Sequence, residues 1–140
     1  MGLNLKSLEA VAEAMVASGK GILAADESTG TIGNRLAQIQ TENTAENRNA
    51  YRDLLFSAEG IENHISGVIM YDETLNQSSL ADGKPYPEYL GAKGMIPGIK
   101  VDTRAHDLAG SEGEKVTSGL DGLDDRLKVY RQIGARFCKW

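Results

Sequence analysis

Four apolar runs, separated by segments of helical periodicity, constrain the fold of this chain more than any other feature. One run begins every 30 to 45 residues, and the runs cover residues 21–25, 65–71, 96–102 and 135–140. Apolar residues recur at helical spacing before and between them, within residues 5–16, 32–39, 51–55 and 123–133. Strands that alternate with helices predict a parallel sheet, and nearly continuous apolar strands are typical of a sheet covered on both faces.

Polar residues gather where these predicted strands end. Asp26 comes directly after the first run, with Ser28 and Thr31 just beyond it, while Lys100 and Lys139 lie near the ends of the third and fourth runs. Doubly wound sheets and (β/α)₈ barrels both bind ligands at the carboxyl ends of parallel strands, so either architecture fits. A barrel typically needs about 250 residues. The chain has 140, which predicts either a smaller open sheet or the first half of something larger.

Composition limits the classes of partner. Hydrophobic residues make up 41% of the chain and the formal net charge is −5, values typical of a soluble globular domain that binds neither nucleic acid nor acidic membranes. No apolar run reaches the roughly 18 residues of a membrane span. Residues 1–7 lack the features of a signal peptide, and Cys138 is the single cysteine. These observations predict a cytoplasmic protein.

Two lysines within apolar strands need an explanation. Lys100 lies between Ile99 and Val101, and Lys139 lies in the last run. Burying an ammonium group is costly unless an anion pairs with it or its pKa falls. One interpretation is that each lysine reaches solvent from an edge or pairs with a structural carboxylate. The other is that both share one face of the sheet with Asp26, where we expect the two lysines to be predominantly buried and Asp26 to lie close enough to share their cavity.

Such a set suits a phosphorylated substrate that contains a carbonyl group. Lysines bind phosphate or polarise an oxygen, and a desolvated lysine can form an imine. The carboxylate of Asp26 can transfer protons. Ser28 and Thr31, with the backbone amides of a helix that starts near Ile32, can bind a phosphate. The turn matches neither the Walker nor the dinucleotide-binding spacing of glycines.

Other polar features point to structure rather than to a site. His64 and His106 have no metal-ligand spacing, to each other or to Cys138, and are expected on the surface or in loops. Residues 72–84 and 103–119 are polar and are expected to form long loops.

The sequence resembles the class I fructose-1,6-bisphosphate aldolases through motifs that occur in the same order. They are Gly19–Gly30 (GKGILAADESTG), Thr41–Thr44 (TENT), Gly67–Ile69 (GVI), Asp82–Pro85 (DGKP), Pro97–Asp102 (PGIKVD) and Gly119–Leu123 (GLDGL). The resemblance covers practically all 140 residues. Since that family folds as a (β/α)₈ (TIM-type) barrel, it implies that residues 1–140 are the N-terminal part of a single barrel domain, with the remainder absent from this chain.

The resemblance implies catalytic roles for two residues. Asp26 matches the aspartate that assists proton transfers and carbon–carbon cleavage. Lys139 matches a fourth-strand lysine that stabilises substrate oxygens and reaction intermediates rather than forming the imine. The family's imine-forming lysine lies on the sixth strand and its principal acid/base glutamate on the fifth, both outside this sequence.

Five further residues are implied to bind substrate. Lys100 matches a lysine that faces the substrate and its distal phosphate, and Ser28 and Thr31 match hydroxyls around that phosphate. Arg35 matches an arginine at the sugar-phosphate rim. Arg48 matches an arginine near the substrate, although its helical position is equally compatible with a structural role. At position 34 this sequence has Asn where a lysine is common in the family, which removes one positive charge from the rim.

The function implied is that of a metal-independent, Schiff-base lyase without a cofactor. It would cleave fructose 1,6-bisphosphate reversibly to dihydroxyacetone phosphate and glyceraldehyde 3-phosphate in glycolysis, as a cytoplasmic homo-oligomer, a tetramer by the resemblance. The 140-residue chain alone is expected to be inactive. The alternative is that the chain itself is the biological product, a non-catalytic binding or interaction protein derived from an aldolase gene.

Overall fold

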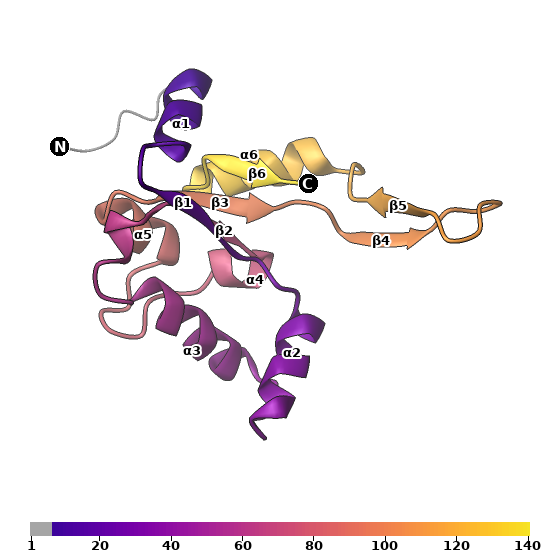
Figure 1. Ribbon diagram of the computed structural model, residues 1–140, viewed down its shortest axis with the longest axis horizontal. Coiled ribbons are helices and arrows are strands. Elements are labelled where there is room, and N and C mark those ends of the chain that lie inside the picture. The colour runs from indigo at the N-terminus through magenta and orange to yellow at the C-terminus, as the bar shows by residue number, and fades with distance from the viewer. Residues whose placement is uncertain (1–6) are drawn as a thin grey trace.

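Four parallel strands form one sheet in the order β1-β2-β3-β6 in the computed structural model, which describes residues 7–140 (Figure 1). They are β1 (Gly21–Ala25), β2 (Ile65–Met70), β3 (Ile96–Lys100) and β6 (Phe137–Lys139). Each corresponds to one of the apolar runs, so the predicted parallel sheet is confirmed. Leu5, which the helical pattern included, lies outside the described residues.

Helices connect and cover these strands. Their bounds are α1 (Leu8–Met15), α2 (Thr29–Gln38), α3 (Ala45–Phe56), η1 (Ile61–Asn63), α4 (Asp72–Leu75), α5 (Tyr86–Ala92) and α6 (Leu123–Ile133). The hydroxyls of Ser7, Ser28 and Thr44 cap the first three of them by accepting a hydrogen bond from a backbone amide in the first turn. The short helix α4 lies inside residues 72–84, where a loop was expected.

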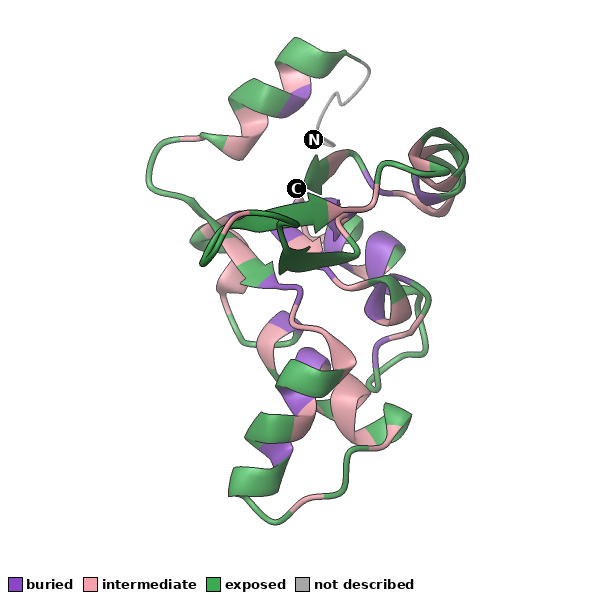
Figure 2. Cartoon of the chain, turned by 90° about the vertical axis from the view of Figure 1, so that its right-hand side faces the viewer, coloured by how far each residue is buried: buried purple, intermediate pink, exposed green. Residues whose placement is uncertain are grey.

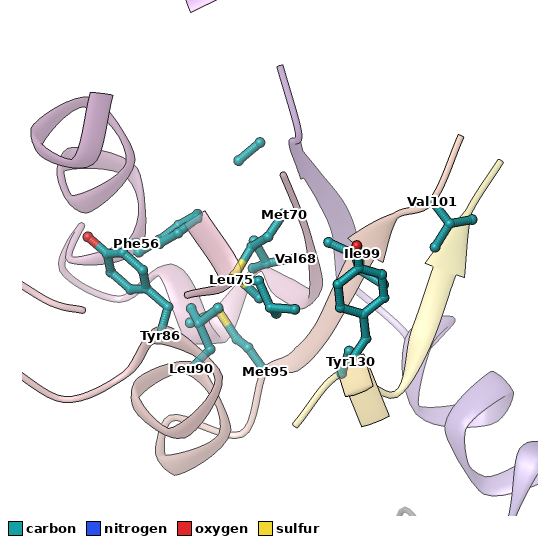
Figure 3. Close-up of a cluster of buried hydrophobic side chains, with 12 residues drawn as sticks. Phe56, Val68, Met70, Leu75, Tyr86, Leu90, Met95, Ile99, Val101 and Tyr130 are labelled. Carbon is teal, nitrogen blue, oxygen red and sulfur yellow. The ribbon is translucent and has the colours of Figure 1, made fainter. Parts of the chain in front are cut away.

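The helix-covered face of the sheet holds the main hydrophobic core (Figure 3). Ala25 on β1, Val68 and Met70 on β2, and Ile99 on β3 alternate onto this face and are at most 1% exposed. They pack against side chains from α3, α4, α5 and α6, among them Phe56, Leu75, Tyr86, Leu90 and Tyr130. The rings of Phe56 and Tyr86 meet edge to face, with centroids 4.9 Å apart.

The opposite face of the sheet carries a different set of side chains. Ile22 on this face is 41% exposed. The ring of Phe137 lies over Gly98 and Gly67, and a Cβ atom at Gly98 would come within 2.3 Å of that ring. The expectation of cover on both faces is therefore met only in part within residues 7–140: Ile96 on this face is fully buried, but the main core lies against the other face.

A two-stranded hairpin projects from the carboxyl end of β3 (Figure 1). Strands β4 (Arg104–Asp107) and β5 (Lys115–Ser118) pair antiparallel, whereas the sequence predicted a long loop here. Nearly all hairpin residues are exposed (Figure 2), so backbone hydrogen bonds rather than apolar burial define the strands. Gly110 and Gly113 adopt positive φ angles of 80° and 79°, which glycine tolerates, in the connecting turn.

Candidate active site

The strand register brings three candidate residues to one level of the sheet. Lys100 on β3 is the direct partner of Lys139 on β6. Ala25 pairs with Met70, and Met70 pairs with Ile99, so Asp26 follows β1 at the level where Lys100 ends β3. Because these positions have the same parity, all three side chains lie on the face opposite the helix-covered core.

Asp26 and Lys139 form an ion pair across the sheet. The Lys139 Nζ atom donates to Asp26 Oδ2 at 2.7 Å, although β1 and β6 are the two outermost strands. Three interstrand spacings of about 4.8 Å would separate these strands by about 14 Å in a flat sheet, which is beyond the combined reach of the two side chains. The sheet must therefore curve around this face, as the wall of a barrel does.

Burial of the pair is uneven. The Asp26 side chain is 9% exposed, whereas that of Lys139 is 43% exposed. The expectation that Lys139 is largely buried is therefore wrong within residues 7–140, where β6 has a neighbouring strand on one side only. The carboxylate of Asp26 compensates for partial desolvation of the Lys139 ammonium group.

Lys100 pairs with a different carboxylate, that of Asp102. Its Nζ atom donates to the backbone oxygen of Asp102 at 2.9 Å and pairs with the carboxylate of the same residue. The Lys100 side chain is 22% exposed, so it keeps contact with solvent on the face of the sheet opposite the helix-covered core. This face is called the open face below. Each lysine thus pairs with a different carboxylate, and a negatively charged ligand would have to compete with Asp102 or with Asp26 for the ammonium group.

The start of α2 presents hydroxyls and backbone amides together. Ser28 Oγ accepts a hydrogen bond from the amide of Thr31 at 3.4 Å and lies 3.1 Å from Thr31 Oγ1. The helix is 10 residues long, so the positive end of its dipole lies at this turn. Since Asp26 directly precedes the turn, the hydroxyls and the Asp26–Lys139 pair belong to the same edge of the sheet.

Arg35 lies one helical turn further along α2. Its side chain is 49% exposed, and its guanidinium donates to the carboxylate of Glu27 and to the hydroxyl of Tyr51. The Glu27 carboxylate raises the pKa of Arg35 above its ordinary value. An anion that reached this rim would compete with Glu27 for the guanidinium.

Arg48 is engaged elsewhere. Its Nε and Nη2 atoms each lie 2.7 Å from a carboxylate oxygen of Glu73, and its Nη1 donates to Asn43 Oδ1 at 2.8 Å. The hydrogen bonds to Glu73 raise the pKa of Arg48. These contacts join α3 to α4 and to the loop before α3, which favours the structural interpretation of Arg48.

Sequence reasoning missed Arg52 and Glu27. Arg52 is 2% exposed, and it donates from Nε to the carbonyl of Ala25 and from Nη2 to the carbonyl of Glu27, both at 2.7 Å. The sequence contained one indication that Arg52 is buried. Arg52 precedes the fully buried Phe56 by four residues, so the two side chains share one face of the helix. A charged residue on the apolar face of a helix calls for a specific partner.

The remaining features lie apart from this edge. A cavity of about 440 Å³ on the helix side is lined by residues of α1, of α6, of β6 and of the turn between α6 and β6, including Leu8, Leu127 and Arg136. His64 and His106 are exposed, as expected. Within residues 7–140 no group of three histidine, cysteine, aspartate or glutamate side chains is placed to hold a metal ion. No helix of the described part is long and apolar enough to cross a membrane.

Comparisons with known proteins agree with this architecture. The family model described as class-I fructose-bisphosphate aldolase matches residues 7–140. A probable fructose-bisphosphate aldolase class 1 of Xylella fastidiosa is 53% identical over 138 residues, which are 99% of this chain and 41% of that protein. Fructose-bisphosphate aldolase 6, cytosolic, of Arabidopsis thaliana is 57% identical over 122 residues, which are 87% of this chain and 34% of that protein.

Comparison with a solved structure also finds an aldolase. The fructose-bisphosphate aldolase of Plasmodium falciparum, crystallised with TRAP and a small-molecule inhibitor, superimposes with a TM-score of 0.88 at 51% identity. The match covers 93% of this chain and 37% of that one. The chain therefore spans about two fifths of the length of the relatives it matches. The predicted fold class, about four parallel strands from the first half of an α/β barrel, is confirmed.

Proposed function

We propose that this chain, which belongs to the class I fructose-bisphosphate aldolase family, supplies one wall of the active site of an aldolase. The reaction is the reversible cleavage of fructose 1,6-bisphosphate to dihydroxyacetone phosphate and glyceraldehyde 3-phosphate in glycolysis. Residues 1–140 are then the N-terminal part of a single barrel domain. The observation that carries the proposal is the Asp26–Lys139 pair, 2.7 Å apart across a sheet that curves around it.

The chemistry divides between these two residues. In the cleavage direction, a proton must leave the hydroxyl group whose oxygen becomes the aldehyde, while the electrons of the broken carbon–carbon bond pass to an imine. Asp26 is a carboxylate that can accept and return a proton in this step. The Lys139 ammonium can stabilise negative charge that develops on substrate oxygens. The imine-forming lysine belongs, by the family resemblance, to a part of the barrel beyond this sequence.

Phosphate binding is proposed at the rim formed by Ser28, Thr31, Arg35 and Lys100. Backbone amides and hydroxyls at the start of α2 favour an anion. Arg35 is exposed and can exchange the Glu27 carboxylate for a phosphate oxygen. For Arg48 the contacts with Glu73 and Asn43 support a structural role instead of substrate binding.

The natural protein is further proposed to be a cytoplasmic homotetramer that needs neither metal nor cofactor. The cytoplasmic assignment is supported by relatives named as cytosolic, among them the isozyme of Arabidopsis thaliana. Sedimentation of the natural protein tests the oligomeric state, and chelation followed by assay tests independence from metal.

The decisive experiment combines intact mass with an assay. The protein purified from its natural source is weighed, and cleavage of fructose 1,6-bisphosphate is measured in the presence of a chelator. A species more than twice as heavy as the 15.1 kDa of this chain, with activity, supports the proposal. A 15.1 kDa species without activity supports the non-catalytic binding protein instead.

A further inference from the structure

We propose that Arg52 is a positioning residue that sets the orientation of Asp26 by holding the two carbonyl groups on either side of it. The inference rests on the proposed function, because Asp26 is the group whose position matters for the chemistry. It concerns a residue of α3 that does not itself touch the open face of the sheet.

The guanidinium group of Arg52 donates hydrogen bonds to two different backbone carbonyl groups. Arg52 Nε donates to the carbonyl of Ala25, the residue before Asp26, and Nη2 donates to the carbonyl of Glu27, the residue after it, each at 2.7 Å. The guanidinium group is planar, and its donors keep fixed relative directions. Two bonds from one rigid plane therefore fix the Ala25–Asp26 and Glu27–Ser28 peptide units, and the short segment between them carries the Asp26 side chain.

Asp26 needs such support because the strand ladder ends just before it. The register between β1 and β2 runs to Ala25 opposite Met70, so Asp26 and Glu27 lie beyond the paired part of the strand. The anchor at this point comes from α3, through the two bonds of Arg52.

Charge balance explains why an arginine can occupy so buried a place. The Glu27 carboxylate lies 3.3 Å from Arg52 Nη2, and the guanidinium carbon of Arg52 lies 5.4 Å from the centre of the Tyr51 ring. Burial lowers the pKa of Arg52, and the charge of Glu27 opposes that shift. Glu27 also binds Arg35, so one carboxylate links the buried anchor to the exposed arginine of the rim.

The test uses the natural full-length enzyme and the substitution Arg52→Lys. Lysine keeps the charge, but its single ammonium cannot hold both carbonyls in the geometry of the guanidinium group. A misplacement of about 1 Å costs on the order of 100-fold in rate, so we expect kcat to fall by about 10- to 100-fold while KM changes less than about threefold. Arg131→Lys, an exposed arginine on α6, is the matched control and should leave both constants unchanged.

A double-mutant cycle separates positioning from general stability. If Arg52 acts through Asp26, then Arg52→Lys should cost little further activity in an Asp26→Asn background. A loss in that background equal to the loss in the parent would overturn the proposal. So would a kcat for Arg52→Lys within twofold of the parent, measured per folded active site.

Amide hydrogen exchange supplies a readout that needs no catalysis. We expect faster exchange at residues 25–28 in Arg52→Lys than in Arg131→Lys, and equal rates would overturn the proposal. If the parent enzyme does not cleave fructose 1,6-bisphosphate, the proposed function fails, and exchange at residues 25–28 still decides whether Arg52 anchors this turn.

Discussion

The two faces of the four-stranded sheet differ in burial and in the kind of side chain that they carry. Ala25 and Asp26 are consecutive, yet Ala25 lies in a core with no exposed surface whereas Asp26 meets Lys139 on the open face. Ile99 and Lys100 divide in the same way on β3. Since successive side chains of a strand point to opposite faces, one short segment places one residue in the core and the next beside the candidate site. Substitutions on the two faces should therefore affect different measurements.

The largest effect on stability is expected from the helix-covered face. Phe56→Ala removes a fully buried ring that packs against Tyr86, and it should lower the free energy of unfolding by about 3–5 kcal/mol. Denaturant titration of the full-length protein measures this change. Leu54→Ala on the same helix, where the side chain is 72% exposed, is the control and should change stability by less than about 0.5 kcal/mol. Equal losses in both variants would contradict the assignment of Phe56 to the core and of Leu54 to the surface.

Lys139→Met should affect activity strongly and stability only slightly, in contrast to Phe56→Ala. Activity should fall by about 100- to 1,000-fold, roughly 3–4 kcal/mol of transition-state stabilisation, because a positioned charge is lost. Stability should fall by less than about 1 kcal/mol, since the side chain is 43% exposed. Steady-state kinetics and thermal unfolding check the two parts. Lys128→Met, on the exposed side of α6, should change neither, and turnover of Lys139→Met within tenfold of the parent would contradict the assigned role.

Gly98→Ala tests how tightly the open face is packed below the ion pair. A methyl group there would lie 2.3 Å from the Phe137 ring, so the ring must move, at a cost of about 1–3 kcal/mol. Gly91→Ala in α5 meets no atom within 4 Å and should be neutral or stabilising. Chemical denaturation compares the two variants, and an unchanged midpoint for Gly98→Ala would show that Phe137 is free to shift.

The smallest effect concerns alkaline pH. Burial raises the pKa of Tyr86, whose hydroxyl donates to Asn49 Oδ1 at 2.8 Å. A raised pKa means that the neutral phenol is favoured in the folded state. Its contribution to stability is complete below the unfolded pKa of about 10 and is lost as pH rises above that value. Tyr86→Phe should cost about 1 kcal/mol at pH 7 and should flatten the decline of stability above pH 10. Parallel declines in parent and variant would contradict this.

The strands and the candidate residues at their ends were predictable because buried parallel strands carry nearly continuous apolar sequence. Asp26 and Lys100 stand out as charged residues beside such runs. The hairpin β4–β5 was not predictable in this way, because its strands bury no face and so show no apolar alternation. Its pairing depends on backbone hydrogen bonds and on glycine turns.

The ion pair and its anchor depend on tertiary structure. Which carboxylate meets Lys139 depends on how strongly the sheet curves, and no local pattern encodes that curvature. Arg52 was missed for a related reason. Its partners are backbone carbonyls of residues 25 and 27, and a carbonyl has no sequence signature. Only its place on the apolar face of α3, four residues before Phe56, could have drawn attention to it.

The Asp26–Lys139 pair has a consequence for the order of folding. The two residues are 113 positions apart in the chain, and closing so long a loop is entropically unfavourable until intervening contacts have formed. The strands between them can add to the sheet in chain order, and β6 then joins β3. The charge pair can therefore close only after β1, β2, β3 and β6 have assembled in register. A folding intermediate that lacks β6 would retain much of the core and yet have no assembled site.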